Sequence, residues 1–198
     1  MVPIVSIVGK SGSGKTTLLE KVITELTRRG YSVGVIKHDA HGFEIDHEGK
    51  DSWRHKKAGA CTVALSSPEK FAVIKDVSVE WTPERIISSY LNDADIVITE
   101  GFKKSAFPKI EVVRKANSTQ PVCGNDKKLL AYVSDFKVSV KHPIFKLDDH
   151  KGVALFIEKE IIKKHQSAGV SLIVDGQKIE LKPFIESLIR DGVTGMIK

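Results

Sequence analysis

The sequence predicts an α/β fold in which a mostly parallel central sheet lies between layers of helices, and three observations predict it. A glycine-rich loop at residues 9–17 joins an apolar run to a helical pattern. A second apolar run, residues 31–37, follows that helix and completes a βαβ unit with parallel strands. A third run, residues 95–100, ends at a carboxylate, as a Walker B strand does. Together they indicate a P-loop NTPase, a three-layer α/β sandwich.

The glycine-rich loop has the Gly-x-x-x-x-Gly-Lys-Thr spacing of a phosphate-binding P-loop. Its residues are Gly9, Lys10, Ser11, Gly12, Ser13, Gly14, Lys15, Thr16 and Thr17. The three glycines permit backbone conformations that a Cβ would forbid, so the N–H groups of the loop can converge on an anion. We expect Lys15 to reach the β- and γ-phosphates and the Thr16 hydroxyl to bind Mg²⁺. The alternative is a glycine-rich turn that happens to contain a lysine.

Composition limits the classes of function. The chain has 198 residues, 41% hydrophobic and 28% charged, as is usual for one globular domain with or without a small appendage. A net charge of +6 favours anionic ligands, but the sequence lacks the interleaved aromatic and basic residues of a nucleic-acid binder. Cys61 and Cys123 lack a CxxC spacing, and no signal peptide or membrane-length apolar run is present. We therefore expect a cytoplasmic protein that binds neither nucleic acid nor membranes.

The remaining elements follow in order. Helices are expected at residues 15–29, 51–58 and 82–91, the last with Thr82 as its cap and Pro83 in its first turn. Short strands are expected at 60–65 and 71–74 around a turn, and further strands at 109–114 and 129–133. The segment between these last two, residues 116–128, is polar, and we expect it to be mobile.

The C-terminal part is predicted to be an extension. Asp148 or Asp149 caps a helix that ends near Gly169, and a hairpin with an Asp175-Gly176 turn and a short helix at 183–189 follow. This organisation predicts a nucleotide-binding domain at residues 1–147 and a small hairpin-helix extension at 148–198.

A loop rich in histidine and aspartate follows the second strand, where ligands bind in open α/β sheets. It spans residues 38–55 and contains four of the seven histidines. In P-loop proteins such a loop often senses the γ-phosphate and holds Mg²⁺ through water, a role open to Asp39 or Asp46. A zinc site at His38 and His41 and a surface loop without a role are the alternatives.

The strand that ends at Glu100 supplies the second acidic candidate. We expect Glu100 to be an outer-shell Mg²⁺ ligand or to orient the attacking water, and Asp95 to be structural. A solvated strand-end acid is the alternative for Glu100. Gly101 would allow a sharp turn beside phosphate. The basic loop that follows, which includes Lys103, either binds a second anionic group or is a solvated charge run.

Three stretches together resemble the molybdopterin-guanine dinucleotide biosynthesis protein B family. They are the P-loop, the segment from Ile36-Lys37-His38 through Asp46, Gly49, Asp51-Ser52 and Ala58-Gly59-Ala60, and Glu100-Gly101-Phe102-Lys103. The resemblance covers residues 1 to about 135. Residues 148–198 are similar to a C-terminal extension that some members from anaerobes carry.

The resemblance implies a GTP-binding accessory protein of molybdenum cofactor synthesis, at most a slow GTPase and often a homodimer. Its implied partners are molybdopterin and the guanylyltransferase that attaches GMP to it, and its implied cofactors are GTP and Mg²⁺. Residues Gly12, Gly14, Lys15, Thr16 and Thr17 would bind phosphates and Mg²⁺. Asp46 and Glu100 would be acidic residues of the site, and His38 and Lys103 would lie near the nucleotide or the pterin phosphate.

Two features of the sequence concern the choice of nucleotide and the contact with a partner subunit. No Asn-Lys-x-Asp motif for guanine is present: Asn125-Asp126-Lys127-Lys128 has the wrong order, and Ser134-Asp135 is another possible base contact. The preference for GTP therefore comes from the resemblance. Lys10 occupies the position from which some dimeric P-loop ATPases reach the phosphates of the partner subunit; a solvent-facing lysine is the alternative.

Two other functions remain open. One is a stand-alone small-molecule kinase or ATPase, although the sequence has no obvious arginine-rich lid. The other is a metal-insertion GTPase that uses the histidine-rich loop as a metal store.

Overall fold

A computed structural model describes residues 2–39, 42–138, 141–167, 172–174, 177–179, 181 and 183–196. The chain forms two compact units, the first from Met1–His38 and Tyr90–Lys198 and the second from Asp39–Ser89. The predicted division at residue 147 is a different partition and stays a prediction.

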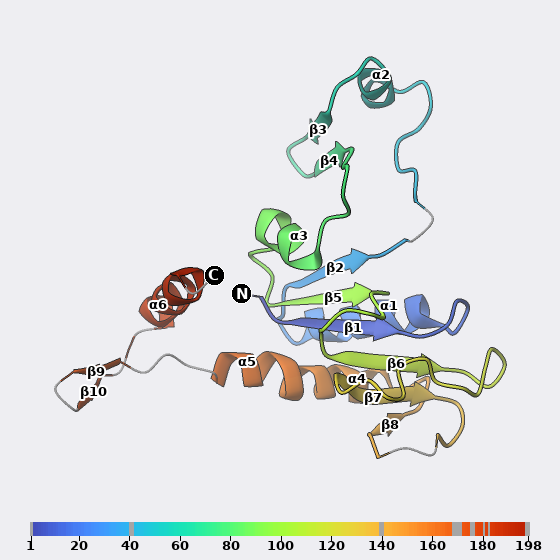
Figure 1. The fold of residues 1–198 in the computed structure, drawn as a ribbon, viewed down its shortest axis with the longest axis vertical. Helices are drawn as coiled ribbons and strands as arrows, with labels where there is room; N and C mark the ends of the chain where they lie inside the picture. Colours follow the sequence, from blue (N-terminus) through green and yellow to red (C-terminus); the bar gives the residue numbers. More distant parts are fainter. Residues whose placement is uncertain are drawn as a thin grey trace. The chain divides into compact units, whose positions relative to one another are not determined.

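The first unit is built on a six-stranded parallel sheet in the order β2-β5-β1-β6-β7-β8 (Figure 1). Its strands are β1 (Ile4–Val8), β2 (Val33–Lys37), β5 (Ile96–Glu100), β6 (Lys109–Val113), β7 (Leu129–Ser134) and β8 (Ile144–Phe145). The predicted parallel orientation of β1 and β2 is confirmed, and β5 lies between them. Glu100 is paired in register with Ile7 of β1 and Lys37 of β2. The last residue of β5 therefore lies at the edge of the sheet where the P-loop begins.

Helices cover one face of this sheet. They are α1 (Lys15–Arg28), α4 (His150–Ile157) and the π-helical segment η1 (Glu158–Lys163), which continues into α5 (Lys164–Ser167). The apolar residues of α1 recur at helical spacing and are buried with those of α4 and the inward residues of β1, β5, β6 and β7. Asp149 caps α4 by accepting a hydrogen bond from the Gly152 N–H at 2.9 Å. The helix that the sequence assigned to the extension therefore contributes Val153, Ala154 and Ile157 to the main core.

A network of ion pairs joins α1 to the π-helical segment. The Glu25 carboxylate, 5% exposed, accepts hydrogen bonds from Arg28 and from Arg29, and Arg29 also donates to Glu158 at 2.8 Å. Lys163 pairs with Glu158 at 2.7 Å. The hydrogen bonds from Arg28, followed by those from Arg29, lower the pKa of Glu25 from 4.5 to about 2, although burial opposes the shift.

This shift predicts an acid-dependent loss of stability. Because the folded pKa of Glu25 lies below its unfolded value, its contribution is present above about pH 4.5 and is lost as the pH falls through about 2. We expect Glu25→Gln to be less stable than wild type at pH 7 and to lose less stability between pH 4.5 and 2, measured by urea unfolding at each pH. Glu20→Gln, an exposed acid on the same helix, should follow the wild-type profile; equal pH profiles for wild type and Glu25→Gln would contradict this account.

β6 carries two buried charged side chains on the face opposite α1. The Lys109 ammonium pairs with Asp126 at 2.8 Å and also donates to the Ser105 and Phe107 carbonyls. The Glu111 carboxylate accepts from the backbone N–H groups of residues 122 and 123. Because a buried charge needs partners, these bonds hold the loops on both sides of β6 in place. The hydrogen bond from Lys109 lowers the pKa of Asp126.

Removing the ammonium group of Lys109 should strongly destabilise the fold. Lys109→Met keeps the aliphatic volume but leaves two carbonyls and a carboxylate without their donor, which we expect to cost about 3 kcal/mol. Urea denaturation measures the change in the free energy of unfolding. Lys127→Met, at an exposed lysine of the neighbouring loop, should change it by less than about 0.5 kcal/mol. Equal stabilities of the two variants would show that the buried contacts of Lys109 have no net effect.

The second unit contains α2 (Asp51–Lys57), the antiparallel strands β3 (Thr62–Ser66) and β4 (Phe71–Lys75), and most of α3 (Pro83–Tyr90). All four elements were predicted. The turn between the strands is closed by the Ser67 hydroxyl, which accepts from the Lys70 N–H at 2.9 Å. The Thr82 hydroxyl accepts from the Arg85 N–H at 3.3 Å, so its predicted role as a helix cap is confirmed.

The C-terminal segment forms the predicted hairpin of β9 (Leu172–Val174) and β10 (Gln177–Ile179), followed by α6 (Pro183–Met196). The predicted hairpin turn at Asp175-Gly176 and the helix end near Gly169 lie outside the described residues. The predicted end of the last helix at residue 189 is wrong, because α6 continues through Gly192 and Gly195. Each glycine costs about 1 kcal/mol relative to alanine in a helix, which weakens this segment without ending it.

Candidate functional site

The P-loop connects the carboxyl end of β1 to the start of α1. Gly9, Gly12 and Gly14 have φ values of 147°, 72° and 90°, so all three adopt conformations that favour glycine. A Cβ on Gly9 would come within 2.5 Å of the Val112 carbonyl oxygen, which shows how closely the loop passes β6. Lys15 folds back over the loop and donates to the Lys10 carbonyl at 2.9 Å. This backbone is the kind of cradle that the sequence predicted.

Thr16 and Glu100 lie far apart in the sequence but are in contact in the structure. The Thr16 hydroxyl, in the first turn of α1, donates to the Glu100 carboxylate at the end of β5 over 2.9 Å. Both side chains present hard oxygen atoms, the ligands that Mg²⁺ prefers. Thr17, next on α1, is exposed. The residues that the sequence named as Walker A and Walker B partners therefore do lie side by side.

Positive charge gathers at this edge of the sheet. Burial lowers the pKa of Lys15; the charge of Glu100 opposes this shift, and that of Lys103 adds to it. Lys103 is exposed in the loop after β5. Its charge lowers the pKa of Lys15, so the two ammonium groups lie within electrostatic range of each other. Lys109, the first residue of β6, is instead fully buried. Exposed cations near a P-loop favour a polyanion.

The turn after Glu100 is tight and holds His38 against it. Gly101 has φ 106°, and a Cβ there would lie 3.1 Å from the His38 Cβ. Phe102 has φ 52°, which is uncommon for a residue with a side chain, and its ring centroid lies 4.6 Å from that of His38. The His38 N–H also donates to the Glu100 carbonyl at 3.0 Å. This turn thus places His38 beside the end of β5.

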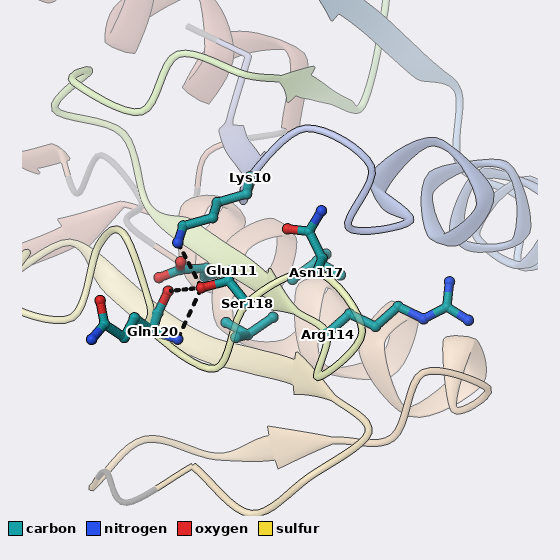
Figure 2. A pocket seen from close by; sticks show the side chains of 8 residues that line it. Lys10, Glu111, Arg114, Asn117, Ser118 and Gln120 are labelled. Atoms are coloured by element: carbon teal, nitrogen blue, oxygen red, sulfur yellow. Dashed lines mark hydrogen bonds between the residues drawn. The ribbon is translucent and has the colours of Figure 1, made fainter.

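A loop after β6 contacts the P-loop from the other side, as Figure 2 shows. The Lys10 ammonium donates to the Ser118 hydroxyl at 2.6 Å, and the Asn117 amide donates to the Ser11 carbonyl at 2.7 Å. Lys10 is therefore half-buried and bonded to Ser118, and its reach to the phosphates of a partner subunit stays a prediction. These contacts could not be predicted from the sequence, because they join residues more than 100 positions apart.

Asp46 belongs to the second unit, and its participation in the site stays a prediction. Its carboxylate accepts hydrogen bonds from the Ser52 hydroxyl at 2.8 Å and from the His47 N–H at 3.0 Å. These bonds hold it at the start of α2. His41 lies outside the described residues, and among those described no three metal-binding side chains form a cluster.

A strand, a phosphate-binding loop and a helix, with a lysine in the loop and a Thr–Glu pair at its mouth, define a P-loop protein of the α/β class. Residues 4–135 match the family model for MobB, molybdopterin guanine dinucleotide synthesis protein B. The chain therefore belongs to the MobB family, as the motifs indicated, and this family places it in molybdenum cofactor biosynthesis.

Individual relatives agree with this assignment. The molybdopterin-guanine dinucleotide biosynthesis adapter protein of Haemophilus influenzae is 37% identical over 79% of this chain and 88% of its own length. The adapter protein of the same description from Escherichia coli is 30% identical over 83% of this chain and 97% of its own. A crystal structure of molybdopterin-guanine biosynthesis protein B superimposes with a TM-score of 0.63 at 38% identity, covering 78% of this chain and 95% of that one. In the described part of this chain, no helix is both long and apolar enough to cross a bilayer.

Proposed function

We propose that this protein binds GTP with Mg²⁺ in its P-loop and acts as an adapter for the guanylyltransferase that attaches GMP to molybdopterin. The observation that carries the proposal is the hydrogen bond between Thr16 and Glu100, which joins the P-loop to the acidic end of β5. The names of the curated relatives, which describe adapter proteins of molybdopterin-guanine dinucleotide biosynthesis, support the role.

The phosphates are held by the backbone N–H groups of residues 9–17 and by Lys15. Lys15 would exchange its bond to the Lys10 carbonyl for bonds to the β- and γ-phosphates. The oxygen atoms of Thr16 and Glu100 fit Mg²⁺, with Asp46 as a further acidic candidate. When bound, Mg²⁺ supplies positive charge that neutralises the phosphate oxygens.

Hydrolysis is slow in this proposal. Glu100 accepts the Thr16 hydrogen bond and would be the carboxylate that orients a water molecule beside the γ-phosphate. A protein that holds GTP for another enzyme requires little turnover of its own. His38, which follows β2, and Lys103, in the loop after β5, would contact a second anionic group such as the phosphate of the pterin.

We further propose a homodimer in which Lys10 reaches the phosphates of the partner subunit. To do so it must leave Ser118, to which it is bonded at 2.6 Å. If Lys10→Ala left both nucleotide hydrolysis and dimerisation unchanged, this part of the proposal would fail.

Reconstitution tests the adapter role. Purified guanylyltransferase, molybdopterin and a limiting concentration of Mg²⁺-GTP are incubated with and without this protein, and the dinucleotide product is quantified. We expect the protein to increase the rate of product formation in proportion to its concentration. An unchanged rate at every ratio of protein to transferase would overturn the adapter role, whatever the nucleotide affinity of the protein.

A further inference from the structure

A cavity lies at the carboxyl ends of β7 and β8, at the same edge of the sheet as the P-loop. It has a volume of about 580 Å³, within the range of small-molecule sites. Its lining comes from two segments that follow these strands, residues 134–137 and 144–148. Polar groups of Ser134 and Asp135 meet apolar surface from Phe136, Phe145 and Leu147. This combination suits a flat, partly polar ring.

We infer that this cavity binds the guanine base of the nucleotide and that Asp135 is the residue that selects guanine over adenine. The inference rests on the proposed binding of GTP and names the part of the site that reads the base.

The order of the strands places the cavity at a suitable distance from the phosphates. The P-loop follows β1, and β7 is the second strand from it, beyond β6. Neighbouring strands lie about 4.8 Å apart, so the end of β7 is on the order of 10 Å from the end of β1. The α-phosphate and ribose of a nucleotide bridge a separation of this order between the β-phosphate and the base.

The Asp135 carboxylate is held in place but retains the capacity to bind a ligand. One oxygen accepts from the Lys115 N–H at 2.8 Å, and the other lies 3.9 Å from the Arg114 guanidinium, too far for a hydrogen bond. An ionised carboxylate offers about four acceptor positions, and the Asp135 side chain is 34% exposed. It can therefore accept further hydrogen bonds from a ligand in the cavity.

A carboxylate at this position discriminates between the purines by their hydrogen-bonding edges. Guanine presents two donors side by side, the N1–H and the 2-amino group, which pair with the two oxygens of a carboxylate. Adenine presents a lone pair at N1 and no 2-amino group, so its edge would face the carboxylate with an acceptor. Two acceptors that face each other repel and leave each other without a donor, which gives selectivity for guanine.

The loop after β6 connects this cavity to the phosphate cradle. Lys115 bonds Asp135 through its backbone, and two residues later the Asn117 amide bonds the Ser11 carbonyl in the P-loop. One short segment thus contacts both the carboxylate that reads the base and the loop that holds the phosphates. Its contacts fix the spacing between the two parts of the nucleotide site.

The test replaces the carboxylate by an amide of the same shape. Xanthine carries a carbonyl where guanine has the 2-amino group, so an Asn side chain, with one donor and one acceptor, matches xanthine and not guanine. We expect Asp135→Asn to bind GTP about 100-fold more weakly than wild type and to gain affinity for XTP by a similar factor, measured by titration calorimetry with Mg²⁺. The matched control is Asp93→Asn, an exposed acid between α3 and β5 that does not line the cavity, which should keep the wild-type preference.

The affinity of the wild-type protein for ITP provides an independent test of the same assignment. ITP lacks the 2-amino group, so we expect it to bind about 10-fold more weakly than GTP. Equal affinities for ITP and GTP, or an Asp135→Asn protein that is folded but gains no affinity for XTP, would overturn the assignment of Asp135 while leaving GTP binding intact. A wild-type protein that binds no nucleoside triphosphate at all would overturn the proposed function as well.

Discussion

Lys15→Ala is expected to weaken the binding of Mg²⁺-GTP by about 100-fold or more. The substitution removes charge-assisted hydrogen bonds to two phosphates, each worth roughly 1.5–3 kcal/mol, and 1.4 kcal/mol corresponds to a tenfold change in affinity. In the structure the Lys15 ammonium donates a hydrogen bond to the Lys10 carbonyl, which belongs to the backbone of the P-loop itself. The fold should therefore tolerate its loss, and titration calorimetry should report a change in affinity without a change in melting temperature.

Lys21→Ala is the matched control for this experiment. Lys21 is an exposed lysine on the same helix, about one turn beyond the P-loop, and removing it lowers the net charge by the same amount. We expect its affinity for GTP to stay within about twofold of wild type, since exposed charges at a distance are screened. Equal weakening by both substitutions would indicate a general electrostatic attraction and would contradict a specific role for Lys15.

Glu100→Gln is expected to reduce the rate of GTP hydrolysis by about 100-fold while leaving the affinity for GTP within a few fold of wild type. The amide oxygen of glutamine can still accept the hydrogen bond from Thr16, so the local structure should persist. The lost negative charge is what would orient or polarise the attacking water, and groups in such roles contribute about 10²–10⁴ in rate. Single-turnover hydrolysis at saturating Mg²⁺-GTP measures the effect.

Asp95→Asn serves as the control, because it removes a carboxylate just before the same strand. Asp95 accepts a hydrogen bond from the Ser32 N–H at 2.8 Å, which an amide oxygen can also accept. We expect its hydrolysis rate to equal that of wild type. If the Glu100→Gln protein hydrolysed GTP at the wild-type rate, Glu100 would have no role in hydrolysis. Glu100 would then be a solvated acid at the end of its strand.

Features encoded within a few residues could be predicted from the sequence. The spacing from Gly9 to Thr16, the caps at Thr82 and Asp149, and the apolar strand ending at Glu100 all depend on near neighbours. For these the local pattern determines both the element and its place in the βαβ unit, because connections of this kind have a fixed handedness.

Features that depend on contacts across the sheet could not be predicted. The placement of β5 between β1 and β2 requires the strand order, which periodicity does not contain. Lys109 and Glu111 fit the alternation of an ordinary strand, and only the structure shows that both are buried with partners from distant loops. The polar loop after β6 contains no motif that predicts a contact with the P-loop, yet its Asn117 side chain donates a hydrogen bond to that loop.

We expect the P-loop of this protein to bind Mg²⁺-GTP in preference to Mg²⁺-ATP. Titration calorimetry of the purified wild-type protein with each nucleotide tests it most directly. We predict saturable binding of GTP with a stoichiometry of one per chain and an affinity for ATP at least about tenfold lower. The absence of binding by either nucleotide, or a stronger affinity for ATP, would contradict this account.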